Sequence, residues 1–135
     1  MPTSASALRR LLVVAGVFPV DIQPFVTSHI EAMLTTGWQV AVCARRVDQP
    51  TLARLSFRDR LSSVHELESA AANLSRARRM RLGWNLLMRF GAGYYRRFPP
   101  ERSKKLSAQA CALFDFAREY RPVAIHAHFG STGQL

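Results

Sequence analysis

The first strong hydrophobic pattern in the chain is a continuous apolar run from Leu11 to Phe18. Such a run predicts a strand that is buried on both faces, as strands of parallel sheets are. From Phe25 the apolar positions recur at helical spacing, and Gly37 is a natural C-terminal cap for that helix. The segment Trp38 to Ala44 then reads as a second strand. Strand, helix, glycine turn and strand predict a βαβ unit, in which the two strands are parallel.

The rest of the chain continues the alternation less regularly. Ser63 to Leu67 predicts a short third strand, and a helix is expected to begin at Glu101 and to end before Pro122. Val123 to His128 predicts a further strand. Alternating strands and helices favour the α/β class. We therefore expect a Rossmann-like open parallel sheet with helices on both faces.

Residues 70 to 98 form a basic segment that contains no acidic residue. On a helical wheel most of its large apolar residues cluster on one side, while five arginines lie roughly opposite. Leu82, Leu86 and Phe90 fall on the arginine side, so the separation is incomplete. The apolar set is Met80, Trp84, Leu87, Met88, Tyr95 and Phe98, and the arginine set is Arg78, Arg79, Arg89, Arg96 and Arg97.

Three interpretations of this basic segment remain open. It can be a solvated helix that covers the sheet. It can also be a peripheral membrane helix, in which Trp84 enters the interface and the five arginines meet anionic head groups. Nucleic-acid binding is the weakest of the three, because no nucleic-acid-binding motif accompanies the charge.

Composition limits the possible functions. At 135 residues the chain has the length of one ordinary domain. Its 19 Lys and Arg against 9 Asp and Glu give a formal charge of +10, which attracts nucleic acid, anionic lipid or phosphorylated small molecules.

The cysteines and the first apolar run bear on localisation. Cys43 and Cys111 lie far apart in apolar stretches, which is typical of reduced core residues. The early apolar run follows two arginines, as in a signal peptide, but no small-residue cleavage site follows it. It is also shorter than the roughly 20 residues that span a bilayer. We expect a cytoplasmic protein.

Two loops are candidates for ligand binding, because ligands of open parallel sheets bind at the carboxyl ends of the strands. The first, Val17 to Phe25, has no G-x-G-x-x-G motif, since Gly16 stands alone, and a dinucleotide site is not expected. The second follows His128 and can offer backbone amides and hydroxyls to an anion at a helix N-terminus. Its residues are Gly130, Ser131, Thr132 and Gly133.

Histidines are the strongest chemical candidates. His126 and His128 alternate on the last predicted strand and therefore share a face. Two ligands do not make a catalytic zinc site, and neither His29 nor His65 has a spacing that nominates it as the third, so we expect no metal. His126 fits a hydrogen-bonded, half-buried residue of the strand. His128, next to the turn, is the better candidate to touch a ligand, as a neutral donor to a hydroxyl or a phosphate.

Two stretches resemble one family. FPVDIQPFVTSHIEAMLTTGWQVAVCARR, residues 18 to 46, resembles the opening of glycosyltransferase family 4 enzymes, with a Phe-Pro loop, a helix, a glycine turn and a V-x-V strand. RPVAIHAHFGSTG, residues 121 to 133, resembles the same family's I-H-A-H-F-G strand and turn. The resemblance covers essentially the whole chain and is weakest over residues 50 to 100.

The resemblance implies a GT-B fold, in which two Rossmann-like domains face each other across a cleft. Residues 1 to 135 would be the N-terminal, acceptor-side domain, truncated and without the second domain that holds the nucleotide-sugar. Enzymes of this kind are retaining, use no metal or cofactor, and often act on glycan or lipid-linked acceptors at the inner face of the membrane. We expect the chain to be inactive alone, and its role to lie in polysaccharide biosynthesis.

The resemblance also implies roles for individual residues. His128 would be the catalytic residue near the transferred sugar, with Phe129, Gly130 and Ser131 shaping the adjoining loop. The opposite wall of the cleft would be Phe18, Pro19, Gln23 and Phe25. The chain departs from the family at Ile22, Gln23 and Pro24, where Ser-Glu-Thr is frequent, and at Val123, where aspartate is common. The alternative function is a non-enzymatic basic α/β module that binds anionic membrane or nucleic acid.

Overall fold

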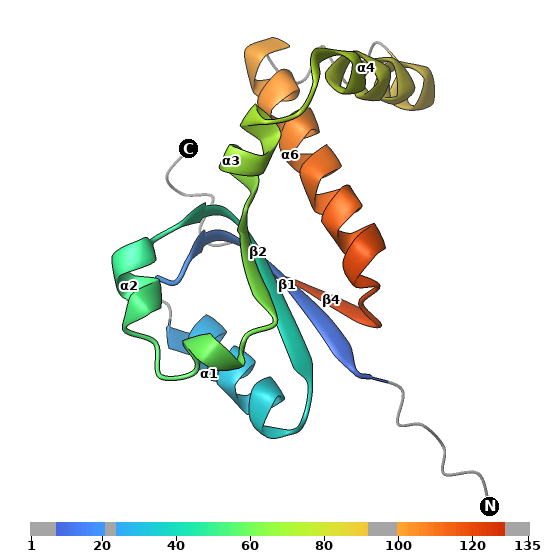
Figure 1. Ribbon diagram of the computed structural model, residues 1–135. Coiled ribbons are helices and arrows are strands. Elements are labelled where there is room, and N and C mark those ends of the chain that lie inside the picture. Colours follow the sequence, from blue (N-terminus) through green and yellow to red (C-terminus); the bar gives the residue numbers. More distant parts are fainter. Residues whose placement is uncertain (1–7, 21–23, 92–99, 129–135) are drawn as a thin grey trace, which may run out of the picture. The chain divides into compact units, whose positions relative to one another are not determined.

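A computed structural model describes residues 8–20, 24–91 and 100–128 of the chain. In chain order the elements are β1 Arg10–Phe18, α1 Pro24–Thr35, β2 Gln39–Val47, α2 Gln49–Ala53, the 3-10 helix η1 Arg58–Arg60, β3 Ser63–Glu66, α3 Leu67–Ala72, α4 Arg76–Phe90, α6 Pro100–Tyr120 and β4 Ala124–His128 (Figure 1).

The four strands form one open sheet in the order β3-β2-β1-β4, and every neighbouring pair is parallel. This is the strand order of the first half of a Rossmann fold. The Rossmann-like α/β class predicted from the alternating pattern is therefore confirmed. All four predicted strands are present, although β2 continues to Val47, beyond the predicted end at Ala44.

The chain divides into two compact units. The first comprises Met1–Glu66 and Tyr120–Leu135, and the second comprises Leu67–Glu119. The whole sheet, α1 and α2 belong to the first unit, whereas α3, α4 and almost all of α6 belong to the second.

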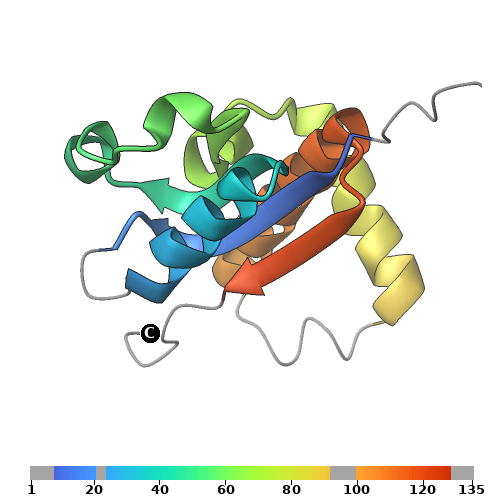
Figure 2. The ribbon, with the colours of Figure 1, turned by 90° about the horizontal axis from the view of Figure 1, so that it is seen from below.

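The core of the first unit lies between α1 and one face of the sheet, and Figure 2 shows α1 running along that face. Val26, Ile30 and Leu34 recur every fourth residue on α1 and are buried, because residues at this spacing lie on one side of a helix. They pack with alternate residues of β1 and β2, among them Leu11 and Val40, which are paired in register.

The opposite face of the central strands is buried as well. Leu12 of β1 and Ala41 and Cys43 of β2 are fully inaccessible to solvent. Burial on both faces explains why the sequence of β1 is a continuous apolar run rather than an alternating one.

Gly37 ends α1 in the way that the sequence predicts. Its φ of 86° is left-handed, and its amide donates to the Leu34 carbonyl while the Trp38 amide donates to the Met33 carbonyl. This pair of hydrogen bonds is the Schellman motif, which satisfies carbonyls that the end of a helix leaves without partners.

The strand β4 is tied to β1 at its start. The Val123 amide donates to the Arg10 carbonyl, and the Arg10 guanidinium donates to the Tyr120 carbonyl at 3.0 Å. The Tyr120 hydroxyl donates to the Gln39 carbonyl, also at 3.0 Å. These contacts fix the register in which Ala15 of β1 lies beside His128 of β4.

Within the second unit, α4 has well-defined ends. The Ser75 hydroxyl accepts from the Arg78 amide at the N-terminus, and Gly91 ends the helix with a φ of 69°. The helix therefore covers only part of the 70 to 98 segment for which the sequence pattern suggested an amphipathic helix. Residues 92–99 lie outside the described residues.

Among the described residues, no helix combines the length and the apolar character needed to cross a bilayer.

Candidate functional site

The topology of the sheet places one edge of the first unit where ligands bind in open α/β folds. From β1 the chain continues to β2 on one side, whereas β4 lies on the other side, so the strand order reverses between β1 and β4. Such a reversal opens a crevice at the carboxyl ends of the two strands. Here β4 ends at His128, which pairs with Ala15 near the carboxyl end of β1.

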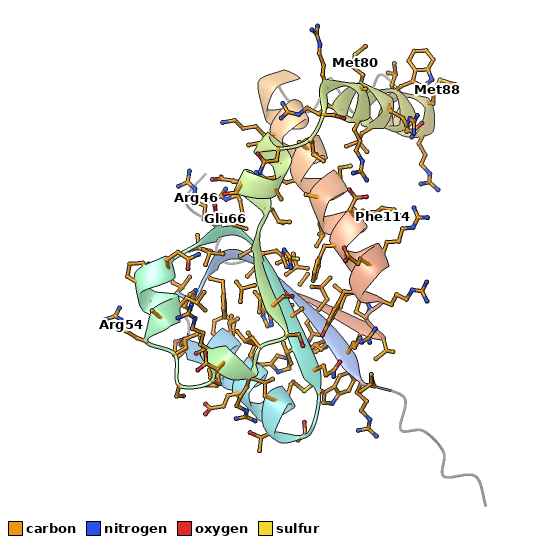
Figure 3. All side chains as sticks on the ribbon, in the orientation of Figure 1. Arg46, Arg54, Glu66, Met80, Met88 and Phe114 are labelled. Atoms are coloured by element: carbon orange, nitrogen blue, oxygen red, sulfur yellow. The ribbon has the colours of Figure 1, made fainter. Side chains whose placement is uncertain are left out.

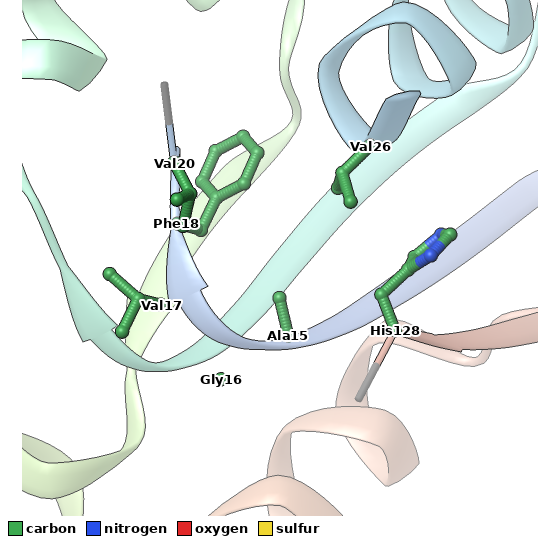
Figure 4. Close-up of a pocket in the computed structure, with 7 residues that line it drawn as sticks. All are labelled: Ala15, Gly16, Val17, Phe18, Val20, Val26 and His128. Carbon is green, nitrogen blue, oxygen red and sulfur yellow. The ribbon is translucent and has the colours of Figure 1, made fainter. Parts of the chain in front are cut away.

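A small pocket lies at this point (Figure 4). It is formed by the end of β1, the residues after it, the start of α1 and the end of β4. The lining residues are Ala15, Gly16, Val17, Phe18, Val20, Val26 and His128. Apart from His128 the lining side chains are apolar, so His128 supplies the side-chain polar chemistry of the pocket.

The imidazole of His128 is half-buried, and its Nε2 atom is shielded from solvent with no hydrogen-bond partner in the described part of the chain. The Phe25 ring lies against it at a centroid distance of 6.0 Å. A buried polar nitrogen without a partner costs free energy, which a ligand or an ion that meets it would offset.

Two further histidines lie beside His128. The His29 Nε2 and the His126 Nδ1 are 2.8 Å apart, which is hydrogen-bond distance, and the two rings are nearly parallel at 16°. The His128 ring meets the His29 ring at a centroid distance of 5.7 Å. His29, His126 and His128, the histidine cluster, each present a nitrogen within 4.8 Å of the others.

Regular structure positions this cluster. His126 and His128 alternate on β4 and face the side of the sheet that α1 covers, since they pair with Val13 and Ala15 of the core. His29 precedes the buried Ile30 on α1 and lies at the flank of the helix nearest β4.

The surroundings favour the neutral form of His29. Its pKa is lowered from the ordinary value of 6.5, first by burial and then by the positive charge that His126 and His128 carry when protonated. At neutral pH the His29 ring therefore keeps a nitrogen lone pair available to a hydrogen-bond donor or a metal ion.

The predicted wall of the cleft is partly described. Phe18 is only 1% exposed and belongs to the hydrophobic core as well as to the pocket lining. Pro19 is buried, whereas Phe25 is 58% exposed. The other predicted residues, Gln23, Phe129, Gly130 and Ser131, lie outside the described residues.

The predicted membrane-facing arginines differ from one another. Arg78 forms an ion pair with Asp115 of α6, and the Arg79 guanidinium donates to the Ala71 and Ala72 carbonyls at the end of α3. Arg89 is exposed on α4. Arg96 and Arg97 lie outside the described residues.

Four large apolar residues on α4 are exposed to solvent. Met80, Trp84 and Met88 are 68%, 63% and 70% exposed, and Leu87 is 37% exposed. Figure 3 shows Met80 and Met88 projecting outward from the helix. These four residues are the exposed apolar stripe of α4.

His29 is the residue of the cluster that the sequence did not nominate. It lies 97 residues before His126, and no local spacing relates the two. The predicted βαβ unit did indicate where His29 lies, because the helix after the first strand must pack against the sheet beside that strand. The sequence also suggested a half-buried His126, but this residue is exposed, although it is hydrogen-bonded as expected.

No family model matches the chain, and neither the curated proteins nor the solved structures give a significant match.

Proposed function

We propose that this chain is the acceptor-side domain of a retaining glycosyltransferase with a GT-B fold, which moves a sugar from a nucleotide-sugar to a glycan or lipid-linked acceptor. The observation that carries the proposal is the position of His128. It ends β4 beside β1, where the strand order reverses, and lines the pocket there. The resemblance of the β4 sequence and its turn to the I-H-A-H-F-G stretch of family 4 supports the same assignment.

In this proposal His128 acts on the sugar as it is transferred. A neutral imidazole can donate one hydrogen bond to a sugar hydroxyl and hold that hydroxyl in place. The apolar pocket walls and the exposed Phe25 ring offer a surface for the face of a sugar ring. A second domain would supply the nucleotide site, and the chain alone would not turn over.

The charge of the chain fits the proposed substrates. A formal charge of +10 favours the approach of anionic donors and of acceptors that carry a lipid diphosphate. The proposal needs no resident cofactor, because the nucleotide-sugar is itself a substrate.

The direct test uses the protein that is expressed when the gene segment for this chain is joined to its adjoining reading frame. Transfer of a radiolabelled sugar from a nucleotide-sugar would be compared between the wild type, His128→Ala and His65→Ala. We expect His128→Ala to lower turnover by about 100-fold or more, as the loss of a positioned hydrogen-bonding side chain does. His65 lies on β3, away from the β1 and β4 ends, and its replacement should leave turnover within a few fold.

Two results would contradict the proposal. One is unchanged turnover in His128→Ala with an unchanged melting temperature. The other is the absence of a second Rossmann-like domain both from the adjoining reading frame and from the neighbouring genes.

A second candidate function rests on the exposed apolar stripe of α4. Four large apolar side chains on one basic helix cost free energy in water, and peripheral membrane binding would remove them from it. Trp84 and the methionines would enter the interface, while Arg89 meets anionic head groups. This function is compatible with transfer to a lipid-linked acceptor at the inner membrane face.

Vesicle sedimentation tests the second candidate. We expect the chain to sediment with vesicles that contain anionic lipid and not with neutral ones, and Trp84→Ala with Arg89→Ala to abolish sedimentation. Phe114→Ala with Arg118→Ala is a matched control, because it removes an exposed aromatic and an exposed arginine from α6. Equal sedimentation with both vesicle types, or none, would exclude the membrane role, and binding to DNA in its place would favour the nucleic-acid alternative.

A further inference from the structure

We propose that His29, His126 and His128 form a binding site for a divalent transition-metal ion, with Zn²⁺ as the best-suited ion. The proposal goes beyond glycosyl transfer and does not depend on it. It revises the expectation from sequence that the chain holds no metal site, because that expectation lacked a third ligand. His29 on α1 is the third ligand.

The distances within the histidine cluster suit a metal. Zinc binds histidine nitrogen at about 2.0–2.1 Å in tetrahedral geometry, which sets neighbouring ligand nitrogens roughly 3.3 Å apart. In the cluster, one pair of nitrogens is 2.8 Å apart and all three lie within 4.8 Å. The required separation falls between these values, so small side-chain rotations would bring all three nitrogens to an ion.

The donor set selects the class of metal. Three imidazole nitrogens suit zinc, copper, nickel and cobalt ions, whereas magnesium and calcium prefer oxygen ligands. Imidazole binds a metal only when the coordinating nitrogen is unprotonated.

The hydrogen bonding of the cluster is incomplete without a further group. One proton shared between His29 and His126 accounts for the 2.8 Å contact. The buried Nε2 of His128 has no partner in the described ranges of the chain. An ion that takes the place of the shared proton binds two rings at once, and His128 can turn to provide the third nitrogen.

Regular structure fixes the backbone position of each ligand before any ion arrives. The register of β4 against β1 fixes His126 and His128 on one face, and the burial of Val26 and Ile30 fixes α1. A site built on a strand and a helix loses little conformational entropy on binding. Three protein ligands also leave one coordination position for water or a substrate, as catalytic zinc sites do.

Isothermal titration of the chelator-treated 135-residue chain with zinc chloride tests the site. We expect one equivalent of zinc to bind. His29→Gln, His126→Gln and His128→Gln should each weaken binding by more than about 100-fold, since loss of a ligand exceeds the 10- to 100-fold effect of losing a residue that orients one. His65→Gln, which removes the one histidine outside the cluster, should bind as the wild type does.

Cobalt absorption gives an independent measurement. Co²⁺ in place of zinc should show the visible bands of a tetrahedral site in the wild type and in His65→Gln, and lose them in His29→Gln. Far-ultraviolet circular dichroism of each metal-free variant verifies folding, and the safest positions are the partly exposed His29 and the exposed His126.

The titration results can contradict the metal site without bearing on the proposed sugar transfer. No binding by the wild type, or equal binding by His29→Gln and the wild type, would overturn the three-histidine site. Sugar transfer plays no part in these measurements, so their failure leaves the proposed glycosyltransferase untouched. Conversely, loss of transfer in His128→Ala says nothing about zinc.

Discussion

Gly37 illustrates how the backbone conformation of one residue determines which residues can replace it. Its φ of 86° is a conformation that side chains with a Cβ rarely adopt, although a Cβ at this position would meet no atom within 4 Å. Gly16 on β1 also has open space around it, but its φ is not left-handed. Comparison of the two glycines therefore separates backbone strain from steric clash.

We expect Gly37→Ala to lower the free energy of unfolding by about 1–2 kcal/mol, which is the cost of the left-handed conformation for a residue with a Cβ. Gly16→Ala should leave it unchanged or raise it by up to about 1 kcal/mol, because glycine in a strand is less favourable than alanine. Urea denaturation of both variants measures the difference. Equal effects of the two substitutions would show that the φ of Gly37 does not govern its replacement.

At the same scale, the sequence predicted only part of the histidine cluster. The alternation of His126 and His128 on a strand follows from local pattern, and so does the position of His128 at the strand end. The contact between His29 and His126 depends on two long-range events, the docking of α1 and the pairing of β4 with β1. The docking of α1 follows from the predicted βαβ unit, but the pairing of β4 with β1 cannot be inferred from the residues around His29.

At the scale of elements, the strands were predictable because burial on both faces imposes an unbroken apolar sequence. The end of α1 was predictable because a glycine is needed there. The place of β1 in the middle of the sheet was not predictable from apolar runs alone, since such runs give no order.

For helix α4, the sequence pattern predicts the wrong environment for one face of the helix. Its Met80, Trp84 and Met88 form an amphipathic pattern that usually indicates a face buried in the protein. These side chains are instead mostly exposed. A helical wheel assigns residues to one side of a helix, but the burial of that side depends on the rest of the molecule.

At the scale of the whole molecule, the alkylation rate of the Cys43 thiol measures how readily the sheet opens. It lies on β2 between Val14 of β1 and His65 of β3 and is fully inaccessible. Burial raises the pKa of its thiol to about 12, so that almost none of it is the reactive thiolate at pH 8. Cys111 on α6 is partly exposed.

Iodoacetamide at pH 8 should alkylate Cys111 at least about 100-fold faster than Cys43, because Cys43 reacts only when the sheet opens. Peptide mass spectrometry over time measures both rates. Urea near the unfolding midpoint should bring the two rates together. Comparable rates in the native protein would mean that β2 is not held between β1 and β3 as described.

The pairing of β1 with β4 has a consequence for synthesis on the ribosome. Leu11 pairs with Ala124, 113 residues later in the chain. At about 5–20 residues per second, roughly 6 to 23 s separate the synthesis of these partners. During that interval one hydrogen-bonding edge of the most apolar strand stays open to other nascent chains, and protection of that edge by chaperones would matter most then.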